Sequence, residues 1–297
     1  MPAYNEVLNS VRVLLIVLTA LSFLPQFYQL HVKKNSLGIS PSYVLCNLIV
    51  ATEQFAILFY LLVSVPEAGG DMFVHKPRTA GDWLNFAQLT TTWVMFLILF
   101  ILTITYRPAH RENLDHVIIY ILYLLITLVP LFLDFIGLTP YFATPSWPEN
   151  DLRENWAFVH GLFINTLMPA FAFLALFPQM AQIWKHVGDP VNYPGLSVLG
   201  LAVQACVFGV TAVSWAWRIS YSDGDYGKGD IPWFWSYGWP VVETGIIAGV
   251  QAFLVLVAWW RGTVERRERR KLGMDGLENG EEGDAADVWE REPLLPQ

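Results

Sequence analysis

Long runs of apolar residues dominate the hydrophobic pattern of the chain. A helix needs about 20 predominantly apolar residues to cross the hydrocarbon core of a membrane. Seven windows reach that length: residues 8–30, 41–65, 83–106, 117–139, 157–184, 196–220 and 237–260. The pattern therefore predicts an all-α integral membrane protein with seven transmembrane helices.

Composition supports this prediction. Of the 297 residues, 54% are hydrophobic and only 15% are charged, and the mean hydropathy is +0.40, which is too apolar for an ordinary soluble domain. The first window lacks a basic flank and a small-residue cleavage site, so we do not expect a cleaved signal peptide. Cys46 and Cys206 both fall inside predicted spans, which indicates neither a disulfide framework nor a zinc site.

Basic residues are distributed unevenly between the two sides of the predicted spans. One side carries eleven lysines and arginines: Lys33, Lys34, Arg107, Arg111, Lys185, Arg261, Arg266, Arg267, Arg269, Arg270 and Lys271. The other side carries four, Lys76, Arg78, Arg153 and Lys228, with Arg12 and Arg218 at span ends. Because cytosolic flanks are enriched in basic residues, we expect a cytosolic C-terminus and a lumenal N-terminus.

Two parts of the chain share one sequence arrangement. Each has P-Q-x-x-Q near the end of a span, then a Gly-Ile-Ser or Gly-Leu-Ser triplet, then an amide residue seven positions after the serine. The matched residues are Pro25, Gln26, Gln29, Gly38, Ser40 and Asn47 in the first copy, and Pro178, Gln179, Gln182, Gly195, Ser197 and Gln204 in the second. Each copy continues through two more spans, and one span separates the copies, which predicts a parallel duplication.

This pattern resembles the PQ-loop repeat family, which includes cystinosin, vacuolar and lysosomal cationic amino acid transporters and, more distantly, SWEET sugar transporters and the KDEL receptor. The resemblance covers about residues 8–260. It implies two parallel three-helix bundles joined by an inverting fourth helix, with a substrate cavity between the bundles. The corresponding parts are a first repeat at 1–110, a linker helix at 111–145, a second repeat at 146–262 and a disordered cytosolic tail at 263–297.

The Pro-Gln pairs also have a physical interpretation. Proline removes a backbone donor and bends a helix, and in a membrane the freed carbonyl needs another partner. We expect Gln26 and Gln179 to supply it. The resemblance implies that Pro25 and Pro178 act as hinges for alternating access, whereas a static kink is the alternative.

Three carboxylates lie inside predicted spans: Glu53, Asp134 and Glu243. Each must face protein or water, because exposing a carboxylate to lipid costs several kcal/mol. Glu53 lies about twelve residues, or ~18 Å, into its span, near the midplane. We expect these groups to bind protons from an acidic lumen and release them toward the cytosol. The alternatives are structural hydrogen bonds for Glu53 and Glu243, and contact with interfacial water for Asp134.

Amide side chains accompany two of these acids on helical faces. At 100° per residue, Asn47 and Gln54 share a face with Glu53, and Gln251 shares one with Glu243. Together with Gln204, these amides are the candidate substrate-binding residues, with helix packing as the alternative. Some members of the PQ-loop family carry an aspartate in the spans of the second repeat, whereas the sixth span here has no acidic residue. The sequence therefore does not identify the substrate.

The sequence favours a proton-coupled exporter that moves a small polar solute out of a vacuole or lysosome-like organelle. An amino acid is the favoured solute. A PQ-loop receptor or nutrient sensor without net transport is the alternative. A retinal protein is excluded because the last span has no lysine, and the motifs of a G-protein-coupled receptor are missing. We expect no enzymatic activity, cofactor, metal or nucleic-acid partner.

The C-terminal tail has a basic and an acidic part. The basic part can extend the last helix and meet anionic lipid. The acidic part has the composition of a disordered segment. Glu290, Leu294 and Leu295 lie near its end and resemble the acidic dileucine sorting signal that adaptor complexes bind on lysosomal and vacuolar proteins.

Overall fold

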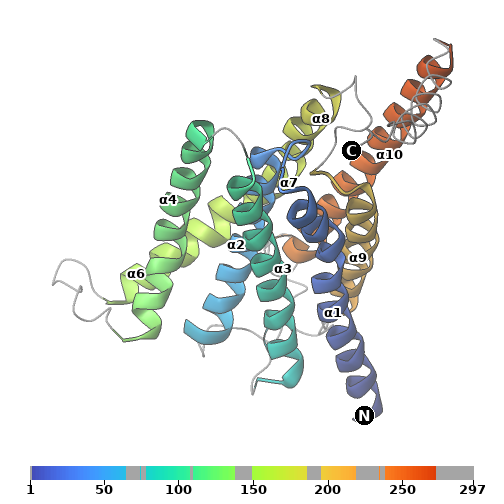
Figure 1. The fold of residues 1–297 in the computed structure, drawn as a ribbon. Coiled ribbons are helices and arrows are strands. Elements are labelled where there is room, and N and C mark those ends of the chain that lie inside the picture. The colour runs from blue at the N-terminus through green and yellow to red at the C-terminus, as the bar shows by residue number, and fades with distance from the viewer. Residues whose placement is uncertain are drawn as a thin grey trace, which may run out of the picture.

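The computed structural model describes residues 2–64, 74, 78–107, 110–137, 149–185, 195–218, 234 and 238–271. Within these ranges every regular element is a helix (Figure 1). The elements are α1 (Pro2–Lys33), α2 (Pro41–Phe59), η1 (Tyr60–Ser64), α3 (Ala80–Thr105), α4 (His110–Phe135), α6 (Glu149–Phe158), η2 (Val159–Ile164), α7 (Asn165–Leu174), α8 (Leu176–Lys185), α9 (Val198–Arg218) and α10 (Trp239–Lys271). The segments η1 and η2 are π-helical.

Seven helical stretches of the described chain are long and apolar enough to cross a membrane. Their ends lie within four residues of the windows predicted from the sequence. Large apolar side chains stay exposed on the outer faces of the helices, for example Leu14, Ile126 and Trp217. A soluble protein would bury such a surface, so the chain is a multi-pass membrane protein.

Proline positions explain the breaks in the fifth span. Pro178 has no N–H for the carbonyl of Leu174, and Leu174 is the last residue of α7. Pro169 similarly frees the carbonyl of Asn165, where η2 gives way to α7. The first span differs, because α1 continues through Pro25. The two Pro-Gln copies therefore share a motif but not an identical helix path.

The helices pack in a repeated order. α3 packs against both α1 and α2, and α10 packs against α9 as well as α7 and α8. Between the two triplets, α1 contacts α9 and α2 contacts α7, while α4 packs on α2. In Figure 1, α1 and α9 lie side by side at the right and α4 lies at the left.

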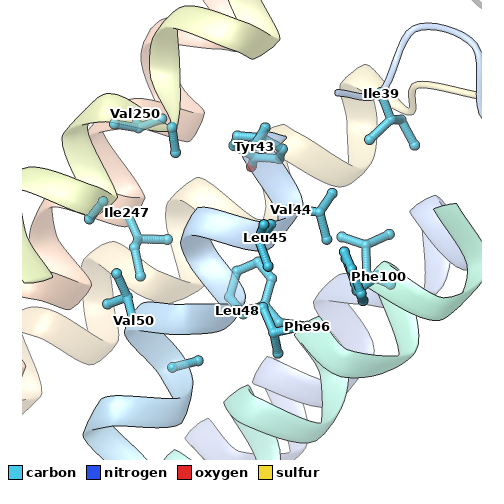
Figure 2. Close-up of a cluster of buried hydrophobic side chains, with 14 of the residues drawn as sticks. Ile39, Tyr43, Val44, Leu45, Leu48, Val50, Phe96, Phe100, Ile247 and Val250 are labelled. Carbon is cyan, nitrogen blue, oxygen red and sulfur yellow. The ribbon is translucent and has the colours of Figure 1, made fainter. Parts of the chain in front are cut away.

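The helix α2 is buried at the centre of this packing. Figure 2 shows Leu48 beside Phe96 of α3 and Val50 beside Ile247 of α10. Leu48 and Phe96 are fully buried. Polar residues on α2 are therefore enclosed by protein on all sides rather than by lipid.

The predicted boundaries of the repeats and the linker can be compared with the observed helix ends. Residue 110 is the first residue of α4, and residue 146 precedes α6. The basic part of the tail extends the last helix, because α10 continues to Lys271. Arginine, lysine and glutamate are good helix formers, which favours this extension. Residues after 271, including Glu290, Leu294 and Leu295, lie outside the described residues.

Candidate functional site

Two amide-containing pairs join helices inside the bundle. The Gln54 Nε2 of α2 donates to the Glu243 Oε2 of α10 at 3.0 Å. The Gln251 Nε2 of α10 donates to the Gln204 Oε1 of α9 at 3.0 Å. All four side chains are at most 2% exposed. The structure thus brings together four of the residues that the sequence singled out, and we call them, with Asn47, the interior polar site.

The pairs lie at two depths. Gln251 follows Glu243 by eight residues of α10, or about 12 Å along the axis. Asn47 precedes Gln54 by seven residues of α2, which runs in the opposite direction, so Asn47 is level with Gln251. The interior polar site therefore extends over about two helical turns.

Several polar atoms of this site have no protein partner among the described residues. They are the Asn47 Oδ1, Gln204 Nε2, Glu243 Oε1 and Gln251 Oε1 atoms. The Asn47 Nδ2 is already used, because it donates to the Tyr43 carbonyl of its own helix at 2.8 Å. An unpaired buried donor or acceptor costs about 1–3 kcal/mol. Sites that keep such atoms commonly bind a polar ligand or ordered water.

Glu53 faces a different set of partners. Its carboxylate lies 2.9 Å from the Nδ1 of His160 in η2 and accepts from the Tyr123 hydroxyl of α4 at 2.5 Å. The Trp156 ring stacks on His160 at 4.3 Å, and its Nε1 donates to the Thr127 carbonyl of α4 at 3.1 Å. The fourth span is thereby tied to both triplets through one buried carboxylate.

Sequence reasoning missed His160 and Tyr123. His160 is 2% exposed inside a predominantly apolar span, and an ionisable residue in such a span is a signal for function. Because its carboxylate binds His160 and Tyr123, Glu53 is separate from the hydrogen bonds described above for the interior polar site. It does interact electrostatically with Glu243, so the two acids influence one another.

Asp134 lies apart from Glu53. It is in the last turns of α4 and is 9% exposed, eleven residues beyond Tyr123, or about 16 Å along the helix. Because Tyr123 marks the level of Glu53, Asp134 is well displaced toward the end of the bundle where α1 begins. We call this the N-terminal end, and the opposite end, where α1 and α8 finish, the PQ end.

The glutamines that directly follow the two prolines, Gln26 and Gln179, form a reciprocal contact at the PQ end. The Gln26 Nε2 donates to the Gly195 carbonyl at 2.5 Å, and the Ser197 N–H donates to the Gln26 Oε1 at 2.9 Å. The Gln179 Nε2 donates to the Gly38 carbonyl at 2.7 Å, and the Ser40 N–H donates to the Gln179 Oε1 at 2.8 Å. Each glutamine thus binds the loop of the other triplet, and we call this arrangement the glutamine clasp.

The clasp corrects one expectation. We expected Gln26 and Gln179 to pair with the carbonyl that proline frees in their own helices, but both polar atoms of each amide are used across the triplets. Buried loop backbone needs partners, and Gly38 and Gly195 are buried.

The loops touch directly as well. The Gly195 N–H donates to the Leu37 carbonyl at 3.0 Å. A Cβ at Gly195 would lie 2.7 Å from the Asn35 and Leu37 carbonyl oxygens, so only glycine permits this approach.

Comparisons with family models, with curated proteins and with solved structures find no match for this chain.

Proposed function

We propose that the chain is a secondary transporter of the PQ-loop type that moves a small polar solute by proton-coupled alternating access. The observation that carries this proposal is the interior polar site. It places unpaired amide and carboxylate atoms at the centre of a membrane bundle. Such atoms would be costly in a protein that served only to pack helices.

The glutamine clasp supplies the conformational part of the proposal. It joins the two triplets at the PQ end through four hydrogen bonds. A state with these bonds is closed at the PQ end, which we propose faces the cytosol. Breaking them lets the triplets separate there, with Pro25 and Pro178 as the hinge positions.

The acids supply the coupling. Glu243 contacts an interior amide through one oxygen, and its other oxygen has no partner in the described part of the chain. A proton on Glu243 would change what this oxygen can donate or accept and hence how the solute is held. Glu53, His160 and Tyr123 are joined by hydrogen bonds, and a change at Glu53 would pass through these contacts to the fourth and fifth spans.

We propose export of an amino acid from an acidic organelle, with the N-terminal end in the lumen. The imbalance of basic residues supports this orientation. The dileucine motif supports a vacuolar or lysosomal membrane, with an adaptor complex as the partner of the tail.

A receptor or nutrient sensor would use the same interior site without net transport. Purified protein in liposomes separates the two functions. A panel of radiolabelled amino acids is supplied outside, with the outside made acidic, and accumulation is followed with and without a protonophore. A transporter accumulates at least one solute in a manner that the protonophore abolishes. A sensor binds a solute without accumulating it, and that result would refute the transport proposal.

A further inference from the structure

Two arginines are buried together at the N-terminal end of the bundle. Arg12 of α1 is 8% exposed and Arg218, the last residue of α9, is 7% exposed. The two helices belong to different triplets and pack against one another. Neither arginine belongs to the interior polar site or to the glutamine clasp.

Both guanidinium groups rest on the first turns of α3. The Arg218 Nη1 donates to the Asn85 Oδ1 at 3.3 Å. The Arg12 Nη1 lies against Gly81, where a Cβ would come within 1.9 Å of it. Gly81 and Asn85 are one turn apart, or about 6 Å along the axis. The two arginines are therefore close neighbours, and they interact electrostatically.

The charges of this cluster do not balance. Asp82 is the carboxylate that interacts with Arg12, and its Oδ2 already accepts from the N–H and the hydroxyl of Thr79 at the start of α3. Among the residues that the structure describes, these two guanidinium groups and one carboxylate leave one positive charge. A buried charge needs a counter-charge, because removing it from water is costly.

Hydrogen-bond donors are also left over. Within the described residues, the Arg12 Nε and the Arg218 Nη2 have no acceptor. One face of the Arg218 guanidinium is covered by the Trp215 ring, with the Cζ 4.7 Å from the ring centroid. The cluster therefore offers one free donor from each arginine, together with a positive charge that no other described residue compensates.

We propose that Arg12, Arg218 and Asn85 form a binding site for the carboxylate of a small solute. The two oxygens of a carboxylate match two N–H donors and one positive charge, and guanidinium groups bind carboxylates with directed hydrogen bonds. Burial inside the bundle favours a small solute over a lipid headgroup. The identification of this solute with the transported one rests on the proposed function, and it narrows the substrate to solutes that carry a carboxylate.

Binding is tested with the purified full chain in nanodiscs, by following thermal unfolding with tryptophan fluorescence. The probes are acetate, its neutral counterpart acetamide, chloride and inorganic phosphate at matched ionic strength. Acetate should raise the unfolding temperature with saturation, whereas acetamide should leave it unchanged. Equal effects of acetate and chloride, or a response to phosphate alone, would refute a carboxylate site.

The decisive variant is Asn85→Asp, which keeps the side-chain shape and places a carboxylate 3.3 Å from Arg218. This internal carboxylate takes the role of the ligand, so acetate binding should weaken at least about tenfold, while the variant folds as well as the wild type. Arg107→Gln, at the PQ end, is the control and should keep the acetate response. Wild-type acetate binding by Asn85→Asp would overturn the proposal. Because the assay needs no gradient, acetate binding without any transport would refute the transport function and leave this site standing.

Discussion

The glutamine clasp makes a quantitative prediction for Gln179→Leu. The substitution keeps a side chain of similar size but removes the partners of the Gly38 carbonyl and the Ser40 N–H. Both groups are buried, and each costs about 1–3 kcal/mol when unpaired. The conformation closed at the PQ end should therefore lose about 2–6 kcal/mol relative to a conformation that does not form these bonds.

At about 1.4 kcal/mol for each factor of ten, this loss shifts the equilibrium at least roughly 30-fold toward the conformation open at the PQ end. Spin labels on cysteines introduced at positions 34 and 185, in a background with Cys46→Ala and Cys206→Ala, report the separation of the two triplets. The labelled positions replace Lys34 and Lys185. Both lysines are exposed at the PQ end. Electron–electron double resonance should show a longer distance component that grows in the variant.

Two comparisons make this test sharp. Gly195→Ala pushes a Cβ into the facing loop. It should produce the same longer distance component, although neither glutamine is substituted. Thr105→Val removes an exposed hydrogen bond to Ile101 near the same end and should leave the distances unchanged. An unchanged distance distribution in Gln179→Leu, with wild-type thermal stability, would refute the clasp as a gate.

Further predictions concern the hinges, the contact between Glu53 and His160, and sorting. Pro25→Ala or Pro178→Ala restores a backbone donor, so transport should slow while solute binding persists; wild-type rates in both would identify static kinks. His160→Gln can still hydrogen-bond to Glu53 but carries no imidazole, so gradient-driven uptake should fall while solute binding persists, and wild-type uptake would remove the histidine from the mechanism. Leu294→Ala combined with Leu295→Ala should move the protein to the plasma membrane, as seen by microscopy, and unchanged organelle localisation would contradict the sorting signal.

The sequence predicted the features that local residues determine. Each span follows from its own run of apolar residues, so the seven windows were found within four residues. The burial of the amides and Glu243 was predictable because a polar residue in an apolar span must face protein.

Contacts between distant parts of the chain were not predictable in this way. Gln26 and Gly195 are 169 residues apart, and His160 and Glu53 are 107 apart. The direction in which a side chain points across the bundle depends on how the triplets pack. For this reason the sequence does not reveal that the two glutamines bind the opposite loops, or that Glu53 faces α4 and η2.

The central claim is proton-coupled transport, and the most direct measurement is solute accumulation driven by an imposed pH gradient in proteoliposomes containing Glu243→Gln. Glutamine keeps the side-chain shape but cannot exchange a proton, so the variant should lose gradient-driven accumulation and keep exchange of solute for solute. Glu53→Gln is the matched comparison, since it removes the other central carboxylate without touching Gln54. Full gradient-driven accumulation by Glu243→Gln would contradict the assignment of coupling to this residue, and no accumulation by the wild type would contradict proton-coupled transport itself.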